Sequence, residues 1–195
     1  IERIATDILG VIDSLDTGPV HLVGHDWGAA VAYVAAAAAP ERFNSLTVMA
    51  VPHAGRFARE GLRIPKQLRL SWYMGLFNIP WLSDWVVSRH DYRFIRWLWR
   101  DWSPSWQPEP GVLEGVISTL SQPGVRSAAL GYYRAALSIK ALLLSAEAAH
   151  YAVPVPTLAL SGERDGCIAS DVFERLMVEQ AVSYTHLRAH ETSRN

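Results

Sequence analysis

The chain has 195 residues, half of them apolar, and its 18 basic residues nearly balance its 19 acidic ones. This composition is typical of a globular domain and lacks both the basic patch of a nucleic-acid-binding protein and an acidic tail. The alanine-rich run at residues 28–39 is shorter than the roughly 20 residues that span a bilayer, so we expect no membrane span. Cys167 is the sole cysteine, which excludes an internal disulfide and favours a reducing, cytoplasmic compartment.

The first 55 residues alternate between helical and extended patterns. Apolar side chains recur at helical spacing through residues 2–16, which predicts a helix. Residues 18–24 predict a turn and a strand, and residues 28–39 predict a helix closed by Pro40. Residues 45–52 predict a second strand.

A long segment without strand alternation follows. Residues 56–150 are rich in Trp, Leu and Tyr and are interrupted by prolines, so we expect several helices. Residues 155–165 return to a buried strand. Short strands that alternate with helices indicate an α/β fold with a parallel sheet. We therefore expect a core at residues 1–55, an inserted helical cap at 56–150 and a return to the core at 151–181.

Both ends of the chain differ from the interior. The composition shifts at residue 182, and residues 182–192 back-translate to a transposon-end adapter used in preparing sequencing libraries. We therefore expect residues 182–195 to be a non-native tail, which removes His186 and His190 from consideration as functional residues. The sequence opens at Ile1 in the middle of a predicted helix, so we expect an internal fragment of a longer protein.

The motif "GHDWG" places an acid at a sharp turn between a strand and a helix. Small residues such as Gly24 and Gly28 are needed on either side of such a turn. Asp26 stands where a nucleophile elbow carries its reactive side chain, and the positive end of the following helix favours negative charge there. An ionised carboxylate can attack an electrophilic carbon without a neighbouring base and leave an ester. The alternative is that Asp26 only caps the helix.

Four motifs together resemble the α/β-hydrolase fold and, within it, the epoxide hydrolases. They are "HLVGHDWGAAVA", "VMAVPH" at residues 48–53, "SWYMGLFNIPWL" at 71–82 and "ALGYYRAAL" at 129–137. The resemblance covers residues 1 to about 181. It implies that Asp26 is the nucleophile and that Tyr73 and Tyr133 donate hydrogen bonds to the epoxide oxygen as the ring opens. Tyr132 is the neighbouring alternative to Tyr133.

The resemblance also implies an acid that orients a histidine base. Asp165 follows a strand in "LALSGERDGCI" and fits that place better than Asp171, which lies in the next predicted helix. The base itself is expected further along the chain, and none of the histidines considered for it before the tail is assigned: His25, His53, His90 and His150. The backbone N–H of Trp27 is expected to supply half of an oxyanion hole, and its side chain to line the substrate pocket.

The predicted function is hydrolysis of epoxides to vicinal diols through an aspartyl ester, with the fragment itself inactive. The expected partners are a small hydrophobic epoxide and water, and no cofactor or metal is predicted. The seven tryptophans between residues 72 and 106 suggest a large apolar cavity. A haloalkane dehalogenase and a non-catalytic α/β-hydrolase-like binding protein are the alternatives. The pair Tyr73 and Tyr133 favours the epoxide hydrolase over the dehalogenase, and the oligomeric state stays open.

Overall fold

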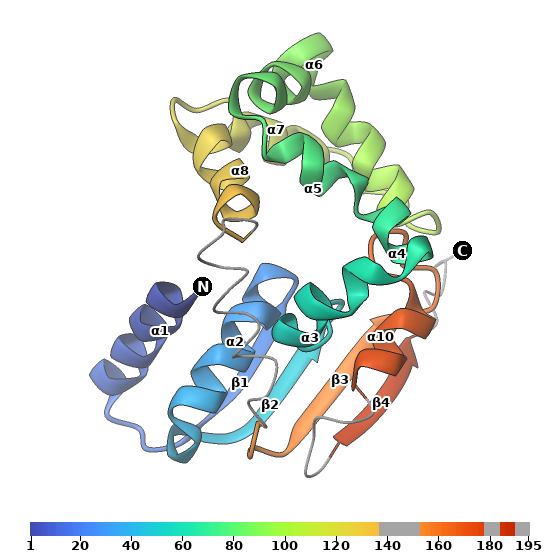
Figure 1. Cartoon of the computed structure of the whole chain (residues 1–195). Helices are drawn as coiled ribbons and strands as arrows, with labels where there is room; N and C mark the ends of the chain where they lie inside the picture. The colour runs from blue at the N-terminus through green and yellow to red at the C-terminus, as the bar shows by residue number, and fades with distance from the viewer. Residues whose placement is uncertain (137–152, 178–183, 190–195) are drawn as a thin grey trace.

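The computed structural model describes residues 1–136, 153–177 and 184–189. It has two parts (Figure 1): a parallel sheet with helices packed on it, and a group of helices beyond the carboxyl ends of the strands. His150 and the end of the predicted cap lie outside the described residues. Within the described ranges no helix is long and apolar enough to cross a membrane.

The sheet has the strand order β1-β2-β3-β4, and every neighbouring pair is parallel. Strands β2 and β3 are neighbours although the whole helical insertion separates them in sequence, which confirms the predicted α/β architecture. The strands are β1 (Val20–His25), β2 (Phe43–Met49), β3 (Thr157–Gly162) and β4 (Tyr184–Ala189).

Strand β4 lies inside the segment that the sequence analysis assigns to a non-native tail. Its backbone pairs with β3 from Tyr184, opposite Thr157, to Ala189, opposite Gly162. Residues 184–189 therefore take an extended conformation at the edge of the sheet, which composition alone did not predict. Its non-native origin stays a prediction.

Helices α2 (Trp27–Ala38) and α10 (Ser170–Met177) pack on the sheet, and α1 (Glu2–Leu15) packs against α2. Helix α1 ends at Asp16, whose left-handed φ of 50° stops the helical path. Helix α2 is almost completely buried, with Ala29, Ala35 and Ala36 at 0% exposure. Because alanine ends at Cβ, the helix axis can lie close to the sheet, where Leu46 and Phe173 complete the core.

The described part of the inserted segment consists of helices joined by loops and contains no strand, as the sequence predicts. Prolines open two of the helices at the first helical position, where a missing N–H costs nothing. Two short 3₁₀ turns, η1 (Pro40–Arg42) and η2 (Gly61–Arg63), join neighbouring elements. The helices are α3 (Ala54–Arg59), α4 (Pro65–Leu70), α5 (Trp72–Phe77), α6 (Pro80–Trp102), α7 (Val112–Leu120) and α8 (Val125–Ala136).

Helix α3 packs on the core, although the expected cap begins at residue 56. The guanidinium of Arg56 donates from Nη1 to the carbonyl oxygen of Leu176 in α10 (3.3 Å) and from Nη2 to Glu60 (3.2 Å). Phe57 contacts the main core cluster as well. The helices that project beyond the sheet therefore start after α3.

Helix α6 bends in its middle, at residues 89–92. His90, Asp91 and Tyr92 have φ values of 53°, 53° and 55°, outside the helical region. The bend brings Tyr92 under α7, where its hydroxyl donates to the carbonyl oxygen of Leu120 (3.1 Å) and accepts from Arg126 Nη1 (3.0 Å). The cap thereby closes around its own apolar cluster, which consists of Tyr73, Phe77, Val87, Tyr92, Leu98, Ile117 and Leu130.

Close packing between β1 and α2 depends on Gly24. A Cβ atom added there would lie 2.5 Å from the carbonyl oxygen of Gly28 and 2.8 Å from the Cα of Ala29. A Cβ added to Gly28 would meet no heavy atom of the described residues within 4 Å. The size limit expected from the motif is therefore found at Gly24 and not at Gly28.

These two glycines make a matched pair for a stability test. We expect Gly24→Val to lower the free energy of unfolding by about 2–3 kcal/mol, because the side chain must push β1 away from α2. Gly28→Ala should be neutral or stabilising by up to about 1 kcal/mol, since Ala is the better helix former. Urea unfolding followed by circular dichroism measures both. Equal losses in the two variants would contradict the close approach.

Candidate active site

Asp26 lies at the apex of a strained turn between β1 and α2. Its backbone has φ 51° and ψ −123°, a conformation that costs a non-glycine residue about 1–3 kcal/mol. Neighbouring backbone holds it there: the Asp26 N–H donates to the carbonyl oxygen of Met49 (3.2 Å), and its carbonyl oxygen accepts from the N–H of Ala29 (2.9 Å). Strain held in this way is a feature of functional turns.

The Asp26 side chain makes no hydrogen bond that caps α2. The structure therefore disfavours the alternative in which Asp26 serves only as a helix cap. The carboxylate is exposed at the amino end of α2, where the helix dipole favours its negative charge. Trp27 is the first residue of the helix, so α2 itself offers no acceptor for its backbone N–H. This fits the expected oxyanion contact.

Tyr73 and Tyr133 come together from two cap helices, α5 and α8. Their ring centroids are 5.7 Å apart, with the ring planes at 84°. Tyr133 also meets the ring of Trp27 edge-on at 5.2 Å, and Phe77 lies against both tyrosines at 5.6 Å and 4.8 Å. Trp102 closes the other side of Tyr73 at 4.8 Å. The two phenols thus share one aromatic cage above the start of α2.

The turn of α8 that carries Tyr133 is anchored to α5 and α6. The Arg134 guanidinium donates to Asp84 Oδ2 (2.8 Å), to Ser83 Oγ (2.9 Å) and to the Phe77 carbonyl oxygen (3.1 Å). The Asn78 side chain donates to the Tyr133 carbonyl oxygen (3.3 Å). The neighbouring Tyr132 ring is 42% exposed. The structure therefore favours Tyr133 over Tyr132 as the inward-facing phenol.

Burial and negative charge act on both phenols. Desolvation is the main cause that raises the pKa of Tyr73 above that of free tyrosine, and Cys167, Tyr133 and Asp26 raise it further. Desolvation followed by the charge of Asp26 raises the pKa of Tyr133, which the Trp27 side chain partly offsets. Each phenol keeps its proton at neutral pH and is a neutral hydrogen-bond donor. The contact between the Tyr133 and Trp27 rings places Tyr133 beside the residue that follows Asp26.

Asp165 lies in the loop after β3, as predicted, and fixes the shape of that loop. Its Oδ1 accepts hydrogen bonds from the backbone N–H of Cys167 (2.7 Å) and of Ile168 (3.0 Å). The same loop contacts the cap, because the Gly166 N–H donates to the carbonyl oxygen of Trp102 (3.0 Å). Asp171, the weaker candidate, pairs with Lys66 on the surface (2.7 Å).

Cys167 is a residue of this site that the sequence reasoning missed. Its Sγ lies 3.1 Å from the Tyr73 hydroxyl, and its side chain packs against both the core cluster and the cap cluster. Burial raises the pKa of the Cys167 thiol to about 12; the hydrogen bond with Tyr73 opposes this rise, and the charges of Asp165 and Asp26 add to it. The one signal in the sequence was its position two residues after Asp165.

The described histidines that were considered as bases lie in other surroundings. His53 is buried, its Nδ1 accepts from the Arg56 N–H (3.4 Å), and its ring lies 5.2 Å from that of Tyr33. His25 is exposed at the end of β1, and His90 is exposed in the bend of α6. These positions agree with leaving the base unassigned.

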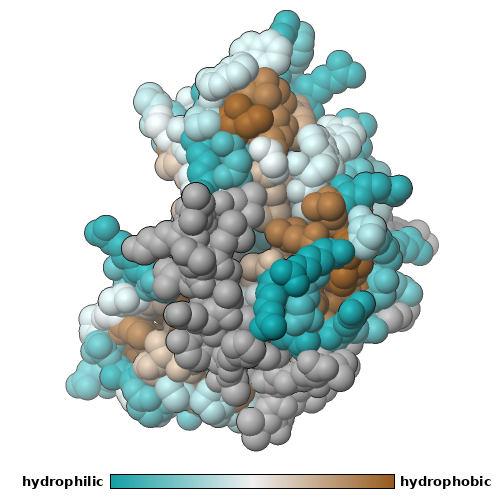
Figure 2. Space-filling model, viewed as in Figure 1, coloured by the Kyte–Doolittle hydropathy of each residue, from teal (hydrophilic) through white to brown (hydrophobic). Residues whose placement is uncertain are grey.

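Many tryptophans of the cap meet solvent, whereas their number suggested a large apolar cavity. Five of them are 40% or more exposed. Figure 2 shows hydrophobic residues that reach the surface in separate patches on both parts of the molecule. The five are Trp72, Trp81, Trp85, Trp97 and Trp106.

A smaller apolar pocket lies beside the elbow, between α1, β1 and α2. It has a volume of about 240 Å³, and Trp27, Gly28 and Tyr132 are among the residues that line it. Ile8 and Val31 contribute to its apolar wall. The prediction that Trp27 lines a pocket is thus consistent with the structure, although its role in binding substrate stays a prediction.

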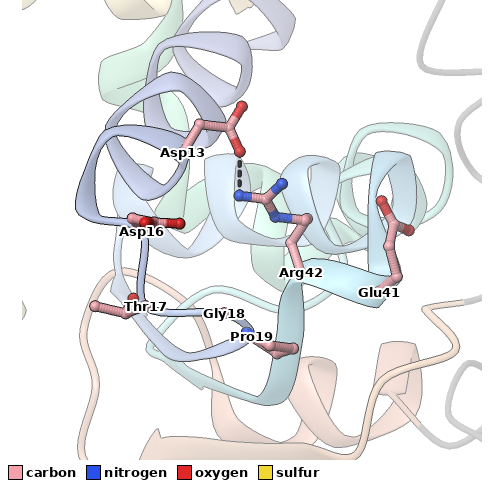
Figure 3. A pocket seen from close by; sticks show the side chains of 7 residues that line it. All are labelled: Asp13, Asp16, Thr17, Gly18, Pro19, Glu41 and Arg42. Atoms are coloured by element: carbon pink, nitrogen blue, oxygen red, sulfur yellow. Dashed lines mark ion pairs between the residues drawn. The ribbon is translucent and has the colours of Figure 1, made fainter.

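A second pocket, of about 360 Å³, lies at the opposite end of β1. Figure 3 shows the Arg42 side chain extended toward Asp13, with which it forms an ion pair, and Glu41 pointing away from it. This pocket holds none of the predicted site residues. Among the described residues, no cluster of three or more His, Cys, Asp or Glu side chains could hold a metal ion.

A strand, a sharp turn and a helix beside a parallel sheet, with a helical insertion between two neighbouring strands, is the arrangement of an α/β hydrolase. The chain matches the alpha/beta hydrolase fold family over residues 1–176. It therefore belongs to the α/β-hydrolase fold family, as the sequence motifs indicate.

Known proteins similar to the chain include several named as epoxide hydrolases. Epoxide hydrolase 4 of Homo sapiens is 33% identical over 179 residues, which cover 89% of this chain and 48% of the relative. Epoxide hydrolase B of Mycobacterium tuberculosis is 41% identical over 111 residues, 50% of this chain and 30% of the relative. The chain spans about half the length, 48%, of the human relative.

Solved structures with a similar fold also include epoxide hydrolases. A crystal structure of a Bacillus megaterium epoxide hydrolase in complex with an inhibitor superposes with a TM-score of 0.76 and 23% sequence identity. The match covers 96% of this chain and 66% of that chain. At this identity the likeness supports the fold.

The buried thiol predicts a pH dependence of stability. An unfolded chain ionises cysteine near pH 8.5, whereas folded Cys167 keeps its proton up to about pH 12. Above about pH 8.5 the folded state binds more protons than the unfolded state, so this contribution is complete below that pH and is lost as the pH rises toward 12. Urea unfolding at pH 7.5, 8.5 and 9.5 should show a decline that is weaker in Cys167→Ser. Parallel declines would contradict the burial of the thiol.

Proposed function

We propose that the protein containing this chain hydrolyses epoxides to vicinal diols through a covalent ester on Asp26. The observation that carries the proposal is the convergence of two phenols, the buried Tyr73 and the half-buried Tyr133, over the start of α2, next to an exposed carboxylate at a strained turn. The similarity to proteins named as epoxide hydrolases supports the same substrate class.

In the first step an oxygen of the Asp26 carboxylate attacks one carbon of the epoxide ring. A carbon–oxygen bond forms to Asp26, the bond from that carbon to the ring oxygen breaks, and its electron pair stays on the ring oxygen. Tyr73 and Tyr133 donate hydrogen bonds to that oxygen as its negative charge develops. Donors already in place before the charge appears stabilise the transition state without reorganisation.

In the second step water attacks the ester carbonyl carbon and releases the diol and the Asp26 carboxylate. The Trp27 N–H stabilises the oxyanion that forms on the carbonyl oxygen. This step needs a base to activate the water, and Asp165 would orient a histidine in that role. We assign no histidine of this chain to it, so we expect the 195-residue chain by itself to stop at the ester.

The haloalkane dehalogenase alternative would use Asp26 in the same way but would not need the phenol pair. A halide leaves as a stable anion, whereas the oxygen of an epoxide remains attached as an alkoxide and needs donors. The cage that fixes both phenols near Asp26 favours the epoxide. A non-catalytic binding protein would have no use for the strained conformation at Asp26.

The nucleophile can be identified on the chain itself. After incubation with styrene oxide, we expect one covalent adduct per chain, located by peptide mass spectrometry on the peptide that contains Asp26. Asp26→Asn should abolish the adduct, because the amide is a poor nucleophile, and thermal unfolding should show that the variant is folded. An adduct on another peptide, with none on Asp26, would overturn the assignment.

The two phenols are tested by the rate of ester formation. Tyr73→Phe and Tyr133→Phe should each slow it by about a hundredfold, because the loss of one well-placed donor costs on the order of 3 kcal/mol. Tyr132→Phe is the matched control and should retain the wild-type rate. Rapid-quench mass spectrometry measures all three. Unchanged rates in both inner variants, or faster alkylation by 1-chlorobutane than by styrene oxide, would favour the dehalogenase.

A further inference from the structure

Tyr73 is held on every side, so the direction of its O–H bond is its main remaining freedom. The residue is 6% exposed, and its ring is packed by Phe77, Trp102 and Tyr133. A phenol has one proton to donate, and the O–H bond can rotate about the bond that joins the oxygen to the ring. The hydroxyl therefore assists an epoxide only when that proton points toward Asp26.

The neighbour of the Tyr73 hydroxyl is the Cys167 thiol, with Sγ 3.1 Å from the phenol oxygen. Two arrangements of this pair are possible. If Tyr73 donates to sulfur, its proton is turned away from the substrate. If the thiol donates to the phenol oxygen, the phenol proton is free for the substrate. The thiol is both a weak donor and a weak acceptor. A bound epoxide oxygen is a better acceptor than sulfur, so it takes the phenol proton and leaves the phenol oxygen to accept from the thiol, which favours the second arrangement.

The Cys167 backbone is fixed from both sides, so its thiol has a defined place. Asp165 Oδ1 accepts from the Cys167 N–H (2.7 Å), and the side-chain amide of Gln67 donates to the Cys167 carbonyl oxygen (2.9 Å). Gln67 is 0% exposed and also accepts from the N–H of Ala169 (3.1 Å) and donates to Ser71 Oγ (3.0 Å). This buried amide of α4 ties the cap to the loop after β3.

We propose that Cys167 is a positioning residue for epoxide opening: its thiol donates to the Tyr73 phenol oxygen and thereby directs the phenol proton toward the oxygen of an epoxide bound at Asp26. The inference rests on the proposed function. The pKa of Cys167, about 12, and the raised pKa of Tyr73 keep both groups protonated at neutral pH. The hydrogen bond from the thiol to the phenol and the one from the phenol to the epoxide polarise each other, so Tyr73 also becomes a stronger donor.

The kinetic test compares variants of Cys167 in the rate of ester formation on Asp26. Cys167→Ala should slow the step by about threefold to tenfold at saturating styrene oxide, with little change in the half-saturating concentration. Cys167→Ser should restore the rate to within about twofold, because the hydroxyl can donate in the same way. In a Tyr73→Phe background, Cys167→Ala should have no further effect.

Three kinetic results would overturn the proposal. They are an unchanged rate in Cys167→Ala, a Cys167→Ser variant as slow as Cys167→Ala, and an equal loss from Cys167→Ala with or without the Tyr73 hydroxyl. The last result would mean that Cys167 acts on packing and not through Tyr73.

A spectroscopic test of the same contact does not depend on activity. The chain has one cysteine, so the S–H stretching band in its Raman spectrum reports on Cys167 alone. Tyr73→Phe should raise the frequency of this band, because the thiol loses its acceptor, and Tyr132→Phe should leave it unchanged. A band that does not move in Tyr73→Phe would overturn the positioning role of Cys167.

The failure of the proposed function would look different: the wild type itself would form no ester on Asp26.

Discussion

The site depends on how closely β1 and α2 approach each other on either side of Asp26. Gly24 leaves no room for a Cβ against the first turn of α2, and the alanines of that helix are buried against the sheet. The chain must therefore reverse within one residue, which puts Asp26 at a φ of 51°. The conformational cost, about 1–3 kcal/mol, is offset by the packing of a buried helix and by backbone hydrogen bonds to β2. The carboxylate stands away from the backbone and is not used to cap the helix.

A second constraint places the cap over this carboxylate. The loop after β3 is held by Asp165 from within and by the cap from outside, through Gln67 and the carbonyl oxygen of Trp102. Cys167 of this loop also contacts the Tyr73 hydroxyl, so the contacts that hold the loop also help to hold Tyr73. Movement of the cap relative to the sheet would disturb both together. The core therefore positions Asp26, and the contacts between core and cap position Tyr73.

Features that depend on local sequence could be predicted. The sharp turn is predicted by five consecutive residues, "GHDWG". Pro65 and Pro80 interrupt the sequence where two helices begin in the structure. The placement of Tyr73 and Tyr133 came from motif resemblance, and the structure brings the two together. Their catalytic roles, and that of Asp165, stay predictions.

Features that depend on tertiary contacts could not be predicted. Cys167 and Tyr73 are 94 positions apart in sequence, and no local pattern links them. The bend in α6 contains neither proline nor glycine, so no helix-breaking signal marked it. The number of tryptophans did not show that five of them face solvent, because composition does not say which side of a thin helical layer a side chain occupies.

The central claim, a covalent ester on Asp26, is tested most directly by where oxygen from water ends up in a single turnover. The complete protein, in molar excess over one aryl epoxide, would be allowed one turnover in heavy-oxygen water, and both diol and protein analysed by mass spectrometry. The account predicts that the diol carries an unlabelled oxygen taken from the carboxylate and that the heavy oxygen is found on the peptide containing Asp26. Heavy oxygen in the diol, with none in that peptide, would show direct attack by water and would contradict the account.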